Sequence, residues 1–293
     1  MKQRTEILKT YKLFINGQFP RSETGHSFQI LNPRTKKPLA NVARGSRKDL
    51  RDAVAAARKA QPGWAAKTAY NRGQILYRMA EVLEGRKKEF ISEMVKMTGC
   101  TPKKAEQEVT TCIDRLVWYA GWADKYQQIF GTVNPVAAPY FNFTLPEPAG
   151  VVGIIVSDEL PLAPLVSKMA PAILAGNTVV MLASEKYPLS AITFAEVIAT
   201  SDVPAGVVNI LTGIKKELIA PLAKHMDVNS VNYTGSDAPT LKLLQEEGAA
   251  NVKRIIAHPY PIGEEWLNNE RAQSPYWIQS FVEMKTTWHP IGI

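Results

Sequence analysis

The side chains that could act as nucleophiles or metal ligands are few in this chain. Only two of its 293 residues are cysteines, Cys100 and Cys112, and they do not have the C-x-x-C spacing of a zinc site. Cys100 follows a Thr-Gly helix stop, and Cys112 lies within a helical pattern of apolar residues. Both are therefore interpreted as free thiols of a reducing compartment, and we expect no metal site.

The histidines offer little more. Three of the four, His26, His225 and His289, fall in segments expected to be loops or tails. Their positions indicate no catalytic pattern, and we interpret them as incidental. The fourth, His258, is followed directly by Pro259 and is considered below.

Composition favours an ordinary globular protein. The chain is 45% hydrophobic and 21% charged, and 35 basic against 27 acidic residues give a net charge of +8. That charge is compatible with an anionic partner or with a solvated basic surface. The basic residues are scattered over expected helices, so we predict no nucleic-acid binding. No signal peptide and no membrane-spanning apolar stretch are recognised, and we expect a cytoplasmic protein with no membrane contact.

The first half of the chain mixes strands with long helices. Asn16-Gly17 predicts a tight turn between extended segments. Ser46 is a candidate N-cap for a helix that we expect to stop at Pro62-Gly63. Two further amphipathic helices follow, and then a long one from about 102 to 128. Residues 140–145 alternate in polarity between two prolines, which predicts a half-buried edge strand.

The second half alternates short apolar runs with helices. The runs are 151–156, 179–182, 207–211, 228–233 and 252–256, and the intervening helices are expected near 162–174, 189–199, 215–224 and 239–247. This alternation predicts a parallel sheet covered on both faces, with ligands bound outside the carboxyl ends of its strands. The remaining residues, 257–293, are broken by proline but contain three tryptophans, Trp266, Trp277 and Trp288, so we expect them to dock on the body.

The order of these segments resembles the aldehyde dehydrogenase superfamily. The similar stretches are 148–153, 175–180, 194–208 with its Val-Pro-Ala-Gly turn, 209–213 and 233–236. The ending, Met284-Lys285-Thr286-Thr287-Trp288, is similar to the C-terminal strand of that family. The likeness is nearest to the truncated C-terminal half of the family-16 type, which carries a segment similar to Ser157-Asp158-Glu159-Leu160-Pro161-Leu162.

This resemblance implies an α/β fold: a Rossmann-like, doubly wound parallel sheet of about five strands with an N-terminal helical segment and a small β oligomerisation flap. Residues 1–257 would form the NAD(P)-binding lobe, divided into an N-terminal part (1–131), a flap hairpin (about 132–148) and a Rossmann part (149–257). Residues 258–293 would supply a connector and the C-terminal flap strand. The catalytic domain of the family would be missing.

The resemblance also implies that the chain lacks a catalytic residue. The nucleophilic cysteine of the family belongs to the missing domain, and neither Cys100 nor Cys112 matches its motif. Glu159 takes the position of the oxyanion-stabilising Asn, where a carboxylate repels the developing charge. His258 lies near the position of the general-base Glu, and we interpret it as a structural or surface histidine.

The cofactor site implied by the resemblance is eroded. Its remaining residues are Glu185, Gly235 and Ser236, whereas Leu182 replaces the lysine that would hold the adenosine ribose. Helix amides after Gly235 could still face a phosphate, but Asp237 opposes one. We therefore expect no firmly bound cofactor, with NAD or NADP binding weakly at best.

Three functions follow as hypotheses. In the first, the chain docks on a full-length aldehyde dehydrogenase, or on itself, through flap strands 140–145 and 281–288, since an unpaired strand edge favours pairing. In the second, it contributes to NAD(P)-dependent aldehyde oxidation only within an assembly. In the third, it senses nucleotides through the residual crevice around Glu185 and Ser236.

Overall fold

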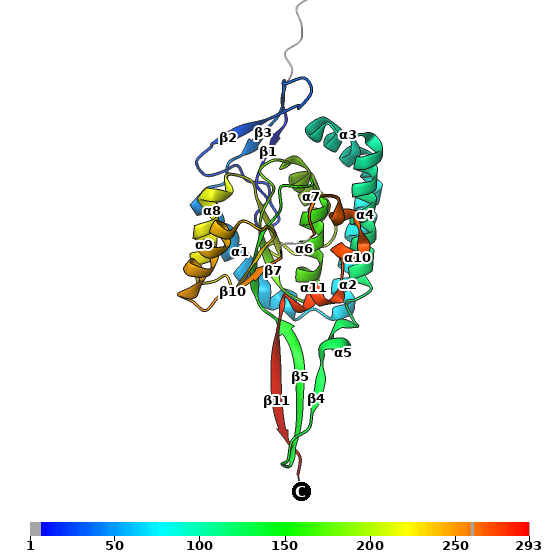
Figure 1. The fold of residues 1–293 in the computed structure, drawn as a ribbon, viewed down its shortest axis with the longest axis vertical. Coiled ribbons are helices and arrows are strands. Elements are labelled where there is room, and N and C mark those ends of the chain that lie inside the picture. The colour runs from blue at the N-terminus through cyan, green and yellow to red at the C-terminus, as the bar shows by residue number, and fades with distance from the viewer. Residues whose placement is uncertain (1–6, 259–260, 293) are drawn as a thin grey trace, which may run out of the picture.

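A five-stranded parallel sheet forms the centre of the computed structural model, which describes residues 7–258 and 261–292 (Figure 1). Its strands are β6 (Val151–Ile155), β7 (Thr178–Leu182), β8 (Val208–Leu211), β9 (Ser230–Tyr233) and β10 (Arg254–Ala257). They lie in the order β10-β9-β6-β7-β8, and every neighbouring pair is parallel. The chain winds from β6 out to β8 and then returns to β9, so the strand order reverses between β6 and β9. The predicted doubly wound α/β fold is confirmed.

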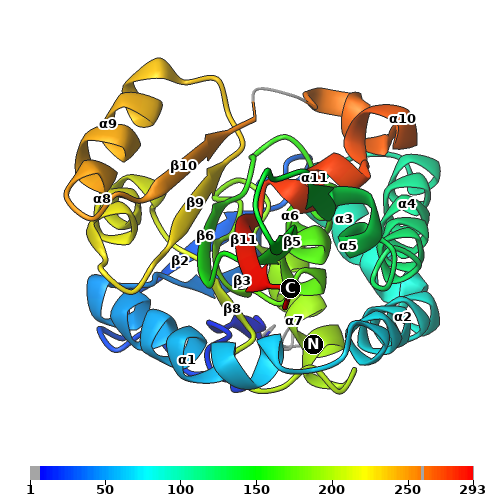
Figure 2. The same cartoon turned by 90° about the horizontal axis from the view of Figure 1, so that it is seen from below.

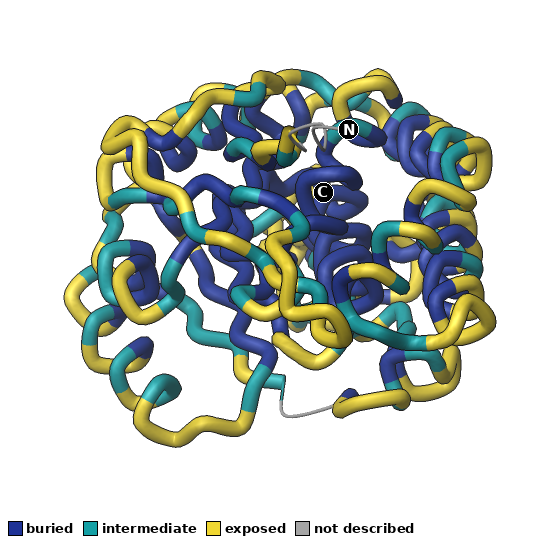
Figure 3. The backbone as a smooth tube through the Cα atoms, turned by 90° about the horizontal axis from the view of Figure 1, so that it is seen from above, coloured by how far each residue is buried: buried dark blue, intermediate teal, exposed yellow. Residues whose placement is uncertain are grey.

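Helices cover both faces of this sheet (Figure 2). One face carries α6 (Ala163–Leu174) and α7 (Leu189–Ala199), backed by α2 (Ala69–Gly85), α3 (Lys87–Thr98) and α4 (Pro102–Ala120). The other face carries α1 (Arg47–Ala65), α8 (Lys215–Lys224) and α9 (Ala238–Ala249). Burial follows this layering, because the tube is buried along the central strands and α6 and exposed mainly on the outer helices and loops (Figure 3).

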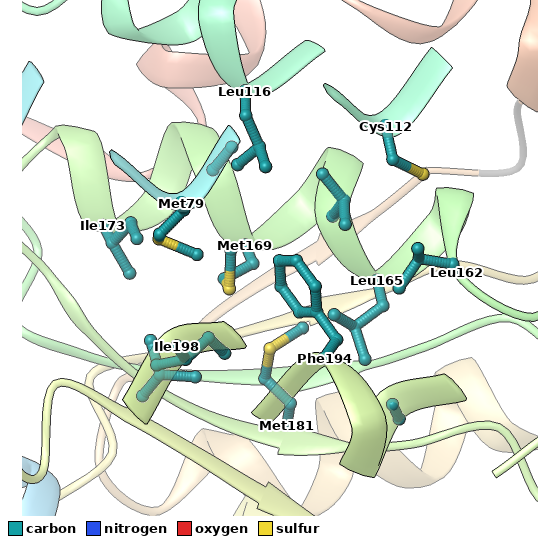
Figure 4. Packing of buried hydrophobic residues seen from close by; sticks show 14 of the residues in the cluster. Met79, Cys112, Leu116, Leu162, Leu165, Met169, Ile173, Met181, Phe194 and Ile198 are labelled. Atoms are coloured by element: carbon teal, nitrogen blue, oxygen red, sulfur yellow. The ribbon is translucent and has the colours of Figure 1, made fainter. Parts of the chain in front are cut away.

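The apolar runs of the sheet supply two separate cores. Val152 and Ile154 of β6 belong to the larger core, which α6, α7, α2 and α4 complete (Figure 4). Val151 and Ile155 point the other way and pack with side chains of α1 and α8. Because successive side chains of a strand alternate between faces, a strand buried on both sides must be apolar throughout.

A small N-terminal sheet lies beside the body. It consists of β1 (Thr10–Tyr11), β2 (Ser27–Leu31) and β3 (Pro38–Ala43) in the order β1-β3-β2. The predicted tight turn is confirmed: Asn16 and Gly17 have φ of 54° and 73°, and Ile15 bridges to Gln18. Asn and Gly tolerate this left-handed conformation better than other residues.

A second small sheet, the flap, extends away from the body (Figure 1). It is formed by β4 (Thr132–Asn134), β5 (Tyr140–Pro148) and β11 (Val282–Pro290), and α5 (Tyr126–Phe130) leads into it. The strand order is β11-β5-β4, so β5 is the central strand and the predicted edge position is wrong. Prolines are tolerated in β5 because β4 pairs only with residues 142–144, which leaves Pro146 and Pro148 beyond its reach.

The segment between β10 and β11 folds onto the body. It contains η1 (Gly263–Leu267), α10 (Asn269–Ala272) and α11 (Pro275–Gln279), and residues 263–281 are called the cap below. Trp266, Ile278 and Phe281 are almost completely buried. The prediction that residues 257–293 dock on the body is therefore confirmed for the cap, whereas Trp288 lies in β11 and is exposed. His289, expected in a loop or tail, also lies within β11, so that interpretation is wrong.

Two predicted helix ends are wrong. Helix α1 continues through Pro62-Gly63 to Ala65, held in place by buried Trp64, whose Nε1 donates to the Ile173 carbonyl at 2.8 Å. The helix expected to reach residue 128 instead ends at Ala120, where Gly121 begins a turn before α5. Across residues 7–258 and 261–292, none of the helices is both long enough and apolar enough to cross a membrane.

Candidate functional site

A cleft of about 600 Å³ opens where the strand order reverses, at the carboxyl ends of β6 and β9. Its apolar lining includes Ile155, Ile219 and Leu243, and its polar lining includes Lys215 and Asp237. This is the position at which doubly wound folds bind ligands. Of the three residues predicted to contact a cofactor, Gly235 lines this cleft, whereas Glu185 and Ser236 are not among its lining residues.

Glu185 is held by the protein itself. Its Oε1 accepts a hydrogen bond from the backbone N–H of Lys215, the first residue of α8. The Lys215 ammonium donates to the Val156 carbonyl at 2.6 Å and pairs with Asp158 at 2.8 Å. Asp158 in turn accepts from the Glu185 N–H at 2.8 Å. Burial alone would raise the pKa of Asp158, but the charge and hydrogen bond of Lys215 outweigh it and lower this pKa.

Side chains of the protein also fill the space around the loop that leads into α9. The Tyr233 hydroxyl lies so close to Gly235 that a methyl group at this glycine would be 2.6 Å from it. The Asp237 side chain caps α9 by accepting from the Thr240 N–H at 2.9 Å, and hydrogen bonding from Thr240 lowers its pKa. A helix N-terminus attracts anions, but this one already holds a carboxylate.

These contacts decide whether a dinucleotide fits. Its ribose would compete with Lys215 for Glu185, and its phosphates would meet the carboxylates of Asp158 and Asp237. The residues present therefore do not fit the diphosphate of NAD or NADP in this arrangement. Weak cofactor binding through Glu185, Gly235 and Ser236 stays a prediction.

Neither thiol lies in the cleft. Cys112 is fully buried between α4 and α6, and burial raises its pKa well above the ordinary value (Figure 4). Because the thiolate is the reactive form, a thiol in this setting is inert. Cys100 follows Gly99, whose left-handed φ of 76° ends α3, and it is half-buried in another pocket with Glu108 and Glu159. In residues 7–258 and 261–292, no group of three potential metal ligands occurs.

Glu159, at the position of an oxyanion donor in the family resemblance, anchors the cap instead. Its Oε2 accepts a 2.7 Å hydrogen bond from Trp266 Nε1. Nearby, Glu108 accepts from the N–H groups of Leu162 and Ala163 at 2.7 and 2.9 Å and so caps α6. Burial raises the pKa of Glu108 to about 7 against the effect of these bonds. Both carboxylates therefore serve the fold.

Two buried cations complete the contact between the body and the cap. Arg115 of α4 donates to Ser167 Oγ at 2.5 Å, to the Trp266 carbonyl at 2.9 Å and to Asn269 Oδ1 at 3.2 Å. The Lys168 ammonium of α6 lies 3.8 Å from the ring centre of Trp277. An aromatic face attracts a cation, but complete burial still lowers the pKa of Lys168 to about 7.

His258 belongs to the same cluster. Its ring centre is 6.1 Å from that of Trp277, and Nε2 lies 3.5 Å from Ser280 Oγ. Burial and the nearby charge of Lys168 lower its pKa to about 4. Such a weakly basic imidazole is a poor general base at neutral pH, and its contacts agree with the predicted structural role.

Sequence reasoning missed Arg115, Lys168, Lys215 and Tyr233. For the two buried cations a signal was available, because each lies among residues that are mostly apolar on the buried face of its helix. Buried cations of this kind need a specific partner, and such a position predicts one. Lys215 and Tyr233 gave no comparable signal, since each is ordinary for its position.

Comparisons with known proteins agree with this architecture. The aldehyde dehydrogenase family profile matches residues 19–258. Omega-crystallin of Enteroctopus dofleini is 36% identical over 86% of this chain and 51% of its own length. Human aldehyde dehydrogenase 1A1 is 36% identical over 83% of this chain and 49% of its own length.

Solved structures agree as well. An NAD⁺ complex of aldehyde dehydrogenase from Bacillus cereus superposes with a TM-score of 0.80 at 31% identity, covering 85% of this chain and 50% of that one. A lactaldehyde dehydrogenase gives a TM-score of 0.81 at 28% identity, over 86% and 52% of the two chains. The present chain spans about half the length of the relatives it matches. From its sheet order, the position of its cleft and these likenesses, the chain belongs to the aldehyde dehydrogenase family.

Proposed function

We propose that this chain is a non-catalytic member of its family that docks on a full-length aldehyde dehydrogenase through the flap. The observation that carries the proposal is an exposed apolar face on the flap. Val133, Phe141 and Leu145 are 69%, 45% and 45% exposed. The strand register places them on one face together with Phe143. A contiguous exposed apolar patch marks an interaction surface.

The chemistry of the body supports the same proposal. Cys112 is sealed in the core, and Cys100 lies in a pocket other than the cleft. The carboxylates of Glu185 and Asp158 are engaged by Lys215. Aldehyde oxidation needs a nucleophile beside a bound nicotinamide, and these contacts favour a binding role over turnover.

The experiment is co-purification with the full-length aldehyde dehydrogenases encoded in the same genome. The tagged chain is co-expressed with each of them and analysed by pull-down and size-exclusion chromatography. We expect one stable complex, which Phe141→Lys and Leu145→Lys abolish because each places a charge in the apolar contact. Tyr70→Lys is the matched control, since Tyr70 is also exposed and apolar but lies on α2, outside the flap.

Two outcomes would contradict the proposal. One is a complex that forms equally well with the Phe141→Lys and Tyr70→Lys variants. The other is NADH production from an aldehyde by the pure chain. If the partner oxidises its aldehyde faster in the complex than alone, the chain contributes to oxidation within an assembly, which is the second hypothesis above.

A further inference from the structure

A row of buried polar side chains follows one face of β9. It consists of Ser230, Asn232 and Thr234, which are at most 6% exposed. Neither the two hydroxyl groups nor the two polar atoms of the Asn232 amide have a hydrogen-bond partner among the residues that the structure describes. Because side chains two residues apart point to the same face of a strand, the three lie in line. Burying a polar group without a partner costs free energy, so this row indicates a polar binding space.

The row faces the side of the sheet that carries α6 and the cap. Asn232 is level with Ile154 of β6 and with Ile256 of β10, and Ile154 belongs to the core that α6 completes. His258 follows Ile256 by two residues, and its N–H continues the ladder to β9 at 3.0 Å. The His258 ring therefore lies on the same face as Thr234 and Asn232.

The opposite wall of this space comes from α6 and the cap. The Lys168 ammonium lies 3.8 Å from the ring centre of Trp277, and that centre is 6.1 Å from the ring centre of His258. His258 Nε2 lies 3.5 Å from Ser280 Oγ. Lys168 is almost completely buried, whereas His258, Trp277 and Ser280 are half-buried. Buried polar groups thus lie behind a half-buried rim, at the junction of β10 with the cap.

The charge in this space is positive and has no counterion. Among the described residues no acidic side chain raises the pKa of Lys168, and burial alone lowers it to about 7. Burial and the charge of Lys168 lower the pKa of His258 to about 4, so its imidazole is neutral at pH 7 and adds no second charge. A single negative charge would balance the buried ammonium.

We propose that this space binds a small monocarboxylate, whose charge pairs with the Lys168 ammonium. One negative charge matches the one buried cation, whereas a phosphate dianion exceeds it and a metal cation is repelled. A carboxylate accepts hydrogen bonds on both oxygens, and the Thr234 hydroxyl and the Asn232 amide offer donors on the same face. The inference goes beyond the proposed function, because none of these residues lies in the flap. Thr234 also lines the cleft, but Lys168, Asn232 and His258 do not.

Isothermal titration calorimetry of the full chain with sodium acetate tests the site. Acetamide is the matched neutral probe, because it has nearly the shape of acetate but no charge. We expect acetate to bind with a dissociation constant of about 1 mM and acetamide at least tenfold more weakly. Lys168→Met removes the charge but keeps the length of the side chain, and it should weaken acetate binding at least tenfold.

Lys253→Met is the control for that variant. Lys253 is also buried, but its ammonium already donates to the carbonyls of His225 and Val228. Its loss should therefore leave the affinity for acetate unchanged. Circular dichroism verifies that each variant is folded.

Asn232→Leu separates a binding role from a structural one. It replaces an unpartnered amide by an apolar group of similar size, so the unfolding temperature without acetate should stay equal or rise. Acetate binding should nevertheless weaken about fivefold. Acetate at tenfold its dissociation constant should raise the unfolding temperature of the wild type by about 2–3 °C, and sodium chloride at the same ionic strength should not.

Three outcomes would overturn the proposal. They are equal binding of acetate and acetamide by the wild type, equal acetate affinity of Lys168→Met and Lys253→Met, and an equal rise in unfolding temperature with acetate and chloride. The last would be a general effect of salt. Because Lys168 lies outside the flap, Lys168→Met should leave the docking on a dehydrogenase intact, so the two proposals can fail independently.

Discussion

Two regions of the molecule differ in how their surface groups are engaged: the cleft beside β6 and β9, and the flap. In the cleft, Lys215 pairs with Asp158 and its backbone N–H bonds to nearby Glu185, and Asp237 caps its own helix. In the flap, an apolar face and a strand edge are turned to solvent. A carboxylate that is already hydrogen-bonded within the protein gains little from binding a ligand. An exposed apolar face or an unpaired strand edge is stabilised when a partner covers it. This difference is why we propose the flap, and not the cleft, as the binding surface of this chain.

Hydrogen bonds hold the cap on the body next to the solvent-exposed flap. Arg115 joins α4 to α6 and to two residues of the cap. Asn177 Nδ2 adds a 2.8 Å bond to the Phe281 carbonyl, where the cap meets β11. The cap therefore holds both the apolar surface of the body and the start of the outermost flap strand.

The largest expected change in the free energy of unfolding comes from a buried residue of the cap. Trp266→Ala removes a fully buried indole and its hydrogen bond to Glu159. We expect a loss of about 3–5 kcal/mol in the free energy of unfolding, the usual cost of truncating a buried aromatic residue. Urea denaturation followed by circular dichroism measures it.

Tyr276→Ala is the control for that measurement. Tyr276 lies in the same cap but is 66% exposed, so we expect it to cost much less. If both variants lose equal stability, the cap is not packed as a part of the body.

A second prediction concerns the charge of Lys168. Its pKa is lowered to about 7 in the folded protein and is about 10.4 in an unfolded chain. Between these values the unfolded state binds the extra proton, so stability rises with pH. Relative to Lys168→Met, the wild type should gain up to about 1.4 kcal/mol per pH unit from pH 7 to about 10.

Urea midpoints of both proteins at several pH values in this window give the difference. Below pH 7 the two curves should run parallel, because Lys168 is then protonated in both states. Between pH 7 and 10 His258 does not disturb the comparison, since its pKa of about 4 keeps it neutral there. Parallel curves above pH 7 would show that Lys168 is not buried as described.

The body illustrates what a sequence can predict about such a fold. The runs that became β6 to β9 were recognised because a strand buried on both faces is largely apolar, and that requirement is visible locally. β10, at the edge of the sheet, is only partly buried. The flap was harder to predict. β5 was expected at an edge because of its prolines, but its position depends on a strand more than one hundred residues away. Likewise, Pro62 was expected to end α1, and the tertiary contact of Trp64 carries the helix past it.

The candidate site was also predicted only in part, because its tertiary contacts are not visible in the local sequence. The resemblance identified Glu185 and Gly235 by their motifs, but not the residues that engage them. Lys215 lies at the start of α8, and its backbone N–H reaches Glu185 only because α8 packs beside the loop after β7. The Tyr233 hydroxyl lies close to Gly235 because its side chain turns back toward this glycine. Contacts of this kind depend on side-chain direction and are not encoded in a short motif.

The cleft can be tested by removing what opposes an anion. Tyr233→Phe with Asp237→Asn deletes the hydroxyl beside Gly235 and the charge at the start of α9, while Asn keeps a side chain able to cap the helix. We expect NAD to bind the wild type no more tightly than about 1 mM and the variant about tenfold more tightly. Isothermal titration calorimetry measures both affinities.

Glu246→Gln is the control for charge, because it removes one carboxylate from the exposed side of α9, where Glu246 pairs with Lys242. Its affinity for NAD should equal that of the wild type. If the wild type already binds NAD as tightly as the double variant, the cleft is open and the nucleotide-sensing hypothesis gains support.

The smallest expected effect on folding comes from the flap. Trp288 is 57% exposed, and its ring meets that of Tyr140 edge to face with centres 5.8 Å apart. An exposed pair of this kind contributes about 0.5–1.5 kcal/mol at most, so Trp288→Ala should change the free energy of unfolding far less than Trp266→Ala. A large loss of stability from Trp288→Ala would mean that the flap is part of the core.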